Sequence, residues 1–334
     1  MTETIKNAET SERVKLIEAK DLTKEFRVNS GMWSKSGGVV HAVTDVNLEI
    51  YEGETLALVG ESGCGKSTLG RLLVNLIEPT RGTVSFRGQV MQELKPEEMR
   101  QLRRKMQFIF QDPYASLNPR WSIRDIVAEP METYKMLGSK QERTERVKEL
   151  LKKCGIRPEF VNRYPHQFSG GQRQRVGIAR ALALDPDLII CDEPVSALDV
   201  SIQAQVLNLL SDLQEEMHLT YLFISHDLSV VRYLSDRVCV MFLGEVCELG
   251  KTKDVYEDPL HPYTKFLLEA VPKPDPKKRK EDKSMLVGEI PSPVNPPSGC
   301  RFHTRCPYAT EICSQQKPEM REVRGRMVCC HHVE

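Results

Sequence analysis

The chain lacks any apolar run of the length that a transmembrane helix needs, so we expect no membrane-spanning helix of its own. It also lacks a net charge, because 47 Lys and Arg balance 47 Asp and Glu, and no global field points to nucleic acid. The first residues lack the charged and then apolar pattern of a secretory signal. We therefore expect a cytosolic protein, or one that reaches a membrane only through partners.

What is present is enough sequence for a large core: 334 residues predict one large domain with an appendage, or two domains. Residues 14–54 alternate apolar and polar side chains, which is typical of antiparallel strands with one wet face. Residues 95–160 carry charged helical patterns, as at 141–153. Between 170 and 245, helical patterns alternate with apolar runs at 188–191 and 221–224, which predicts a parallel sheet.

Composition divides the chain into four parts. Residues 1–13 are polar and predicted to be flexible, and 14–258 form the main domain. Residues 259–298 are rich in Pro and Lys and predict a linker, and 299–334 are a cysteine-rich tail. The basic run at 277–280 could touch anionic lipid or nucleic acid, but its acidic neighbours favour a solvated linker.

The strongest motif is a phosphate-binding loop between an apolar strand at 55–59 and a helical pattern from residue 66. Its glycines let successive backbone N–H groups point at phosphate oxygens, its lysine adds a positive charge, and its serine offers a hydroxyl to Mg²⁺. The predicted nucleotide-binding residues are Gly60, Glu61, Ser62, Gly63, Cys64, Gly65, Lys66, Ser67 and Thr68.

Two further groups accompany the loop. The strand at 188–191 ends in Asp192, placed to hold Mg²⁺, and Glu193, placed to polarise an attacking water. A second turn opens a helix with small residues and can grip another anion; it consists of Ser169, Gly170, Gly171 and Gln172. One nucleotide loop and two phosphate-gripping helix ends are most simply reconciled by two chains packed head to tail.

Five of the ten cysteines crowd the last 35 residues. Thiolates from one chain can satisfy either Zn²⁺ or an iron–sulfur cluster, and the spacing alone does not choose between them. Zinc with help from His303 or His331, and free thiols, are the alternatives to a cluster. The predicted metal ligands are Cys300, Cys306, Cys313 and Cys330.

These motifs, in this order, resemble the ATP-binding-cassette (ABC) ATPases. They are the loop at 60–67, Gln111 after Phe110, the turn at 168–172, the Asp192-Glu193 pair, the run at 196–199 and His226 after Ser225. The runs at 111–120, 194–201 and 261–264, with the cysteine tail, are most similar to ATPase subunits of oligopeptide and dipeptide permeases. The excursion near 29–38 and the run at 61–70 resemble the second of the two ATPase subunits that such permeases usually carry.

The resemblance implies an α/β fold: a parallel-sheet nucleotide core, an antiparallel β subdomain, a helical subdomain at about 112–180 and a small cysteine-rich tail domain. It assigns Phe26 to adenine stacking, Gln111 to Mg²⁺ and the attacking water, and Asp199 to the dimer seam. Glu193, His226 and Gln111 would be catalytic, and Ser67, Gln111 and Asp192 would hold Mg²⁺. In the tail it implies a 4Fe–4S cluster, with Cys330 preferred to Cys329 because it precedes a histidine.

The resemblance also implies an ATP-hydrolysing subunit that powers uptake of dipeptides or oligopeptides. Its partners would be a sister ATPase, two transmembrane permease subunits and an extracellular peptide-binding protein, with no nucleic acid. It would then lie at the cytoplasmic face of the cell membrane, held there by the transmembrane subunits. A nickel or metal-chelate importer and a soluble ABC ATPase without a transporter are the alternatives.

Overall fold

The structure is a computed structural model that describes residues 13–28, 38–271 and 289–334. The predictions for the N-terminal residues 1–13, the excursion near 29–38 and the basic run at 277–280 fall on residues that lie, apart from residues 13 and 38, outside this part of the chain. They stay predictions.

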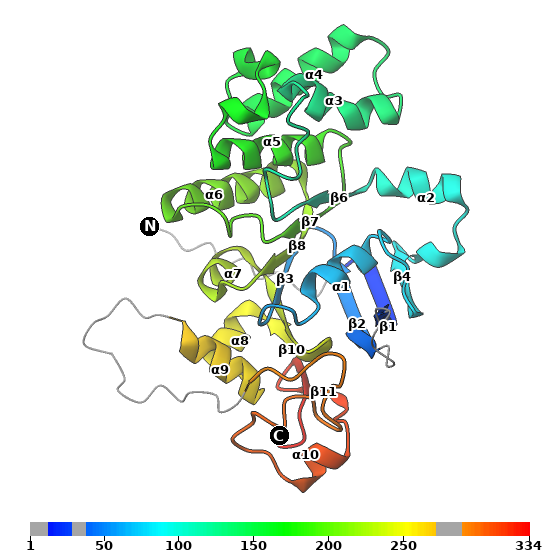
Figure 1. Ribbon diagram of the computed structural model, residues 1–334, viewed down its shortest axis with the longest axis vertical. Coiled ribbons are helices and arrows are strands. Elements are labelled where there is room, and N and C mark those ends of the chain that lie inside the picture. The colour runs from blue at the N-terminus through cyan, green and yellow to red at the C-terminus, as the bar shows by residue number, and fades with distance from the viewer. Residues whose placement is uncertain (1–12, 29–37, 272–288) are drawn as a thin grey trace, which may run out of the picture.

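An eight-stranded sheet forms the centre of the molecule, in the order β11-β12-β10-β9-β3-β8-β7-β6 (Figure 1). The pairs from β9 through β6 are parallel, which confirms the predicted parallel sheet, and the pairs from β11 to β9 are antiparallel. The strands are β3 (Thr55–Val59), β6 (Met106–Ile109), β7 (Leu188–Asp192), β8 (Thr220–Ser225), β9 (Arg237–Phe242), β10 (Glu245–Lys251), β11 (Met320–Val323) and β12 (Arg326–Cys329).

Both faces of the parallel region are buried. Successive side chains of a strand point to opposite faces, so Leu56 and Leu58 of β3 join one apolar cluster while Ala57 and Val59 join another. The first cluster includes side chains of helix α1 and of a smaller, four-stranded sheet. The other cluster includes side chains of α3 to α7. This double burial explains why β3 reads as a continuous apolar run.

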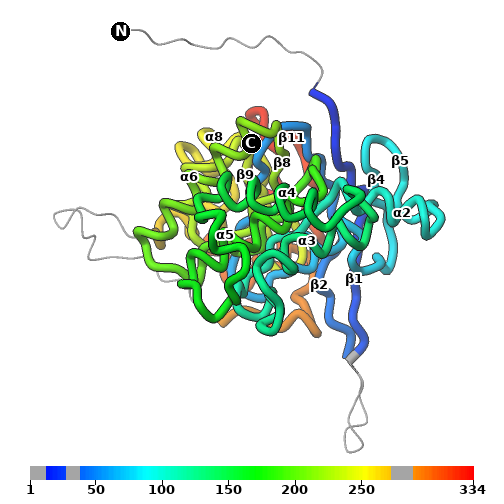
Figure 2. The backbone as a smooth tube through the Cα atoms, turned by 90° about the horizontal axis from the view of Figure 1, so that it is seen from above, coloured from blue at the N-terminus to red at the C-terminus, as the bar shows by residue number. Residues whose placement is uncertain are grey.

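A second, four-stranded sheet runs in the order β2-β1-β4-β5. All of its strand pairs are antiparallel, which confirms the prediction made for residues 14–54. Figure 2 shows these strands and α2 on one side of the molecule and α6 and α8 on the other. The strands are β1 (Lys15–Val28), β2 (Gly38–Tyr51), β4 (Arg81–Phe86) and β5 (Gln89–Val90).

Helices α3, α4 and α5 gather at one end of the molecule (Figure 1). Helix α4 begins with a capping box of Ser139 and Glu142 and confirms the helix predicted at 141–153. Within the described ranges, no helix combines the length and apolar character that a bilayer crossing requires. The helices are α1 (Lys66–Leu73), α2 (Pro96–Arg103), α3 (Ile123–Thr133), α4 (Lys140–Lys153), α5 (Gly170–Leu182), α6 (Val200–Met217), α7 (Leu228–Leu234), α8 (Thr252–Glu257), α9 (Pro262–Ala270) and α10 (Glu311–Gln315).

The C-terminal tail is built into the large sheet, which corrects the expectation of a separate tail domain. Strand β12 pairs with β10 through Glu248 opposite Val328, and β11 then pairs with β12. Phe302 is buried against Phe242, with ring centroids 5.3 Å apart. Helix α9 also lies inside the segment predicted as a linker. The tail thus shares the sheet and the core of the main domain.

One buried ion pair fixes the tail hairpin to this sheet. Glu248 is fully buried and accepts hydrogen bonds from the backbone N–H groups of Leu260 and His261. Arg326 of β12 lies 3.4 Å from it and donates to the carbonyl oxygens of Asp254 and Asp258. Removing one partner of such a pair leaves an uncompensated buried charge.

We therefore expect Arg326→Met to lower the free energy of unfolding by about 3 kcal/mol. Urea denaturation followed by circular dichroism measures this change. Arg324→Met is the matched control, because Arg324 is exposed and its ion pair with Asp258 contributes less than about 1 kcal/mol. Equal losses in the two variants would contradict a structural role of the buried pair.

Candidate functional site

The phosphate-binding loop joins β3 to α1, as the sequence predicted. Two of its glycines are required by close approach of other backbone. A Cβ on Gly60 would lie 2.2 Å from the carbonyl oxygen of Met241, and one on Gly65, whose φ is +104°, would lie 2.1 Å from that of Ala42. The predicted residues Ser62 and Gly63 complete the turn, and Thr68 lies in the first turn of α1.

Lys66 is buried at the start of α1, with 5% of its surface exposed. Its Nζ donates to the carbonyl oxygens of Gly60 and Glu61 at 2.8 and 2.9 Å. Cys64 Sγ lies 3.8 Å from the same nitrogen, and burial raises the pKa of that thiol. The loop therefore curls around its own lysine, and the ammonium lies where its charge can reach an anion held by the loop.

Ser67 and Asp192 meet beside the loop. Ser67 Oγ donates to Asp192 Oδ1 at 2.8 Å, although the residues are 125 positions apart in the chain. Burial raises the pKa of Asp192, and the hydrogen bond from Ser67 and the charge of Arg71 oppose that shift. A hydroxyl and a carboxylate at one point offer the oxygen ligands that Mg²⁺ prefers, so these residues fit the predicted Mg²⁺ role.

The three predicted catalytic residues converge. Gln111 Nε2 donates to Glu193 Oε2 at 2.7 Å, and His226 Nδ1 lies 3.3 Å from Glu193 Oε1. They follow the ends of β6, β7 and β8, which are neighbours in the sheet. Glu193 has a φ of 46°, an uncommon conformation for a non-glycine residue and one that is found at functional sites. A carboxylate held from both sides can orient and deprotonate a water molecule.

Phe26 lies near the end of β1, opposite Val40 of β2. The residue is 40% exposed, and Lys24 Nζ lies 5.2 Å from the centroid of its ring. An exposed ring beside a cation suits the stacking of a flat base.

The second glycine turn forms the N-terminal cap of helix α5. Ser169 Oγ accepts from the N–H of Gln172, whose side chain accepts from the N–H of Ser169. A Cβ on Gly171 would lie 2.3 Å from Ile202 of α6, and one on Gly170 would contact Leu198. The turn thus packs against the segment that contains Asp199, the N-cap residue of α6. The structure brings these two predicted elements together.

The predicted metal site is not assembled. Within the described ranges, no group of three or more His, Cys, Asp or Glu side chains is arranged to hold a metal ion. Cys300 and Cys306 pack against the main core, whereas Cys330 belongs to a small cluster with Leu260 and Val328. Cys313 Sγ lies 3.3 Å from His332 Nε2. Burial, and after it the charges of Cys330, Cys313 and Cys306, raise the pKa of Cys300, so the four thiols are neighbours. They nevertheless do not form a group arranged to hold a metal ion in the described residues, and the four-cysteine site is not supported.

Two residues that contact the loop were not predicted as site residues. Arg305 forms an ion pair with Glu61 at 2.7 Å, and the hydroxyl of Tyr263 accepts from the N–H of Glu61 at 2.9 Å. Both come from the C-terminal part of the chain, more than 200 positions from Glu61. Tyr263 belongs to the run at 261–264, which indicated the family but no contact with the loop. No spacing rule points to Arg305.

Comparisons with known proteins agree with this geometry. The sequence profile of the family described as "ABC transporter" matches residues 43–196, and that of the "Oligopeptide/dipeptide transporter, C-terminal region" matches 247–313. The chain is 54% identical to the oligopeptide transport ATP-binding protein AppF of Bacillus subtilis, over 95% of this chain and 97% of that protein. It is 53% identical to OppF of Escherichia coli, over 98% and 99%.

Solved structures give the same result. The chain resembles a dimeric, post-hydrolysis ATP-binding cassette, MJ0796, bound to ADP and Pi. The TM-score is 0.63 at 35% identity, over 71% of this chain and 99% of the other. The chain therefore belongs to the ATP-binding-cassette transporter family, among the ATP-binding proteins of oligopeptide and dipeptide transporters.

Proposed function

We propose that this chain is the ATP-hydrolysing subunit of an importer that carries dipeptides or oligopeptides across the cell membrane. The observation that carries the proposal is the similarity over nearly the whole chain, including the C-terminal region, to oligopeptide transport ATP-binding proteins. The convergence of Gln111, Glu193 and His226 beside the phosphate loop supplies the chemistry.

In the proposed reaction, Phe26 stacks on adenine, and Lys66 with the loop amides holds the phosphates. Ser67, Asp192 and Gln111 hold Mg²⁺, which neutralises phosphate charge when it is bound. Glu193 takes a proton from water as the water oxygen bonds to the γ-phosphorus and the bond to the β-phosphate oxygen breaks. His226 orients Glu193 through Oε1, while Gln111 holds Oε2.

The active form in this proposal is a head-to-tail dimer with a sister ATPase. The side chains of Ser169 and Gln172 form hydrogen bonds within the turn at 169–172 and so cap the N-terminus of α5. This N-terminus is the second phosphate-binding helix end of the proposal. It would cover the γ-phosphate bound by the partner, with Asp199 at the seam. The dimeric cassette structures among the similar proteins support this arrangement. ATP binding would close the dimer, and hydrolysis would open it.

The remaining partners follow from the same family. We place the subunit at the cytoplasmic face of the membrane, bound to two transmembrane permease subunits that receive peptide from an extracellular binding protein. Residues of about 112–180 would form the helical subdomain, and we take the chain to be the second ATPase of the pair. A 4Fe–4S cluster or Zn²⁺ is not part of the proposal, because the described residues contain no group of three or more His, Cys, Asp or Glu side chains arranged to hold a metal ion.

Deletion of the gene tests the cargo. We expect the host cell to lose accumulation of a radiolabelled tripeptide, with recovery on expression of the wild-type chain. Uptake of a labelled free amino acid is the control and should persist. Unchanged peptide uptake together with lost uptake of Ni²⁺ would contradict the proposal and support the nickel or metal-chelate alternative.

A further inference from the structure

The phosphate-binding loop contains an acidic residue, Glu61, and all of its polar groups have partners. Its N–H donates to the Tyr263 hydroxyl, and its carbonyl oxygen accepts from Lys66 Nζ. Its carboxylate accepts two hydrogen bonds from Arg305, at 2.7 and 3.2 Å. Glu61 therefore links the lysine of the nucleotide site to two residues from the C-terminal part of the chain.

Arg305 and Tyr263 are held firmly. The side chain of Arg305 is only 6% exposed, and its guanidinium lies 5.8 Å from the ring centroid of Phe242. Tyr263 is fully buried and packs against Phe242 and Phe302, with centroids 4.8 and 5.3 Å away. Aromatic packing of this kind leaves little freedom, so the loop rests on a rigid support.

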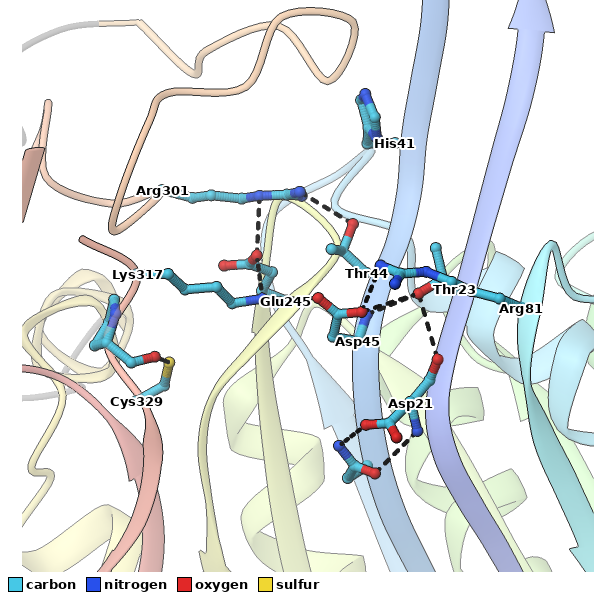
Figure 3. Close-up of polar contacts among 12 residues, drawn as sticks. Asp21, Thr23, His41, Thr44, Asp45, Arg81, Glu245, Arg301, Lys317 and Cys329 are labelled. Atoms are coloured by element: carbon cyan, nitrogen blue, oxygen red, sulfur yellow. Dashed lines mark hydrogen bonds and ion pairs between the residues drawn. The ribbon is translucent and has the colours of Figure 1, made fainter. Parts of the chain in front are cut away.

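The tail segment that carries Arg305 has a second, separate attachment (Figure 3). Arg301 forms an ion pair with Glu245 and donates to Thr44 Oγ1, and Lys317 pairs with Glu245 and Asp45. Arg301 also donates to the carbonyl oxygen of Leu243, and the next residue, Gly244, donates to the carbonyl oxygen of Cys64 in the phosphate loop. Lys317 joins the tail to β10 and β2 through Glu245 and Asp45, so it is the better control for tail attachment.

The negative charge of Glu61 affects how the loop can bind ATP. A carboxylate in a loop that must receive a triphosphate repels the ligand, and the repulsion is strong at short range in a partly buried site. A bidentate arginine neutralises the carboxylate and fixes its direction. A loop that is already ordered loses less conformational entropy when the ligand binds.

We propose that Arg305 is a positioning residue for ATP binding: it holds the Glu61 carboxylate, which keeps Lys66 and the loop amides arranged for the phosphates. This inference rests on the proposed ATPase function and extends it, because it gives the C-terminal tail a direct part in the nucleotide site. Arg305 acts through Glu61 and does not itself contact ATP.

The test measures ATP affinity of the purified full-length chain by equilibrium dialysis with radiolabelled ATP, together with the thermal midpoint of each variant. We expect Arg305→Gln to raise the Kd about tenfold, because the unpaired Glu61 carboxylate then repels ATP. Adding Glu61→Gln removes that charge, and we expect the double variant to return to within about threefold of the wild-type Kd. Lys317→Gln, which removes the ion pairs with Glu245 and Asp45, should lower the thermal midpoint but change the Kd less than about twofold.

Three results would overturn the inference: an unchanged Kd in Arg305→Gln, no recovery in the double variant, or an equal loss in Lys317→Gln, which would indicate general loosening of the tail. If Arg305→Gln does not fold, Arg305→Lys keeps the charge and loses the bidentate geometry. A stable Arg305→Lys protein should bind about threefold more weakly, and an unchanged Kd would refute the role. Wild-type protein that binds no ATP would refute the proposed function as well, whereas failure of the variants alone refutes only this inference.

Discussion

Glu193→Gln should bind ATP but hydrolyse it at least a hundredfold more slowly than the wild-type protein. The amide keeps the size of the side chain and can still contact Gln111 and His226, but it cannot accept a proton from water. A positioned general base contributes about 10²- to 10⁴-fold to the rate of a proton-transfer reaction. Steady-state release of phosphate by the assembled complex measures the effect, and ATP affinity measured separately shows that the nucleotide site is intact.

The matched control is Glu216→Gln, since Glu216 is exposed on α6 and pairs with Lys153 at the surface. We expect its rate to stay within about twofold of wild type. If Glu193→Gln turned over ATP at the wild-type rate, Glu193 would not be the base, and the roles assigned to Gln111 and His226 would fall with it.

Lys66→Ala should lose at least about a hundredfold in affinity for ATP. Lys66 is 5% exposed and lies in the curl of the loop, so its charge acts on phosphate with little screening by water. Loss of one partner of a buried, hydrogen-bonded charge pair costs about 2–5 kcal/mol, and a hundredfold corresponds to about 2.7 kcal/mol. Isothermal titration calorimetry with ATP and Mg²⁺ measures the change.

Lys66 also bonds two carbonyl oxygens of its own loop, so the variant must be checked for folding by its thermal midpoint. Lys105→Ala is the control, because Lys105 is half exposed and pairs with Asp187 away from the loop. Tight ATP binding by folded Lys66→Ala would remove the lysine from the site and leave the backbone amides as the main phosphate ligands.

Local patterns predicted the parts of the fold whose stability is local. The loop at 60–67 lies between β3 and α1 as expected, because glycine spacing and an apolar run are properties of adjacent residues. The separate carboxylate and histidine motifs were predicted one by one from strand ends and from the family resemblance. The structure adds that Ser67 reaches Asp192 and that Gln111 and His226 hold Glu193.

Long-range pairing explains what the sequence could not provide. The composition of 299–334 resembles that of an independent module, yet β12 pairs with β10. The four residues of β12, Arg326–Cys329, carry no sequence signal that predicts a partner strand some 80 positions away. The contact of Arg305 with Glu61 has the same origin, since an arginine in a loop carries no local signal of its partner. Spacing of cysteines likewise cannot show whether their side chains take up the arrangement that a metal ion needs.

The hairpin that extends the sheet has a consequence for experiments that use the cassette without its tail. Strand β10 bonds β9 on one side and β12 on the other, so a protein that ends after α9 would expose the free backbone N–H and C=O groups of β10. Open strand edges of this kind invite pairing between molecules and aggregation. Exchange of tails between related subunits therefore requires the exchange of β10 and its buried Glu248 as well. The C-terminal hairpin covers the edge of β10 and is not a module that can be transferred alone.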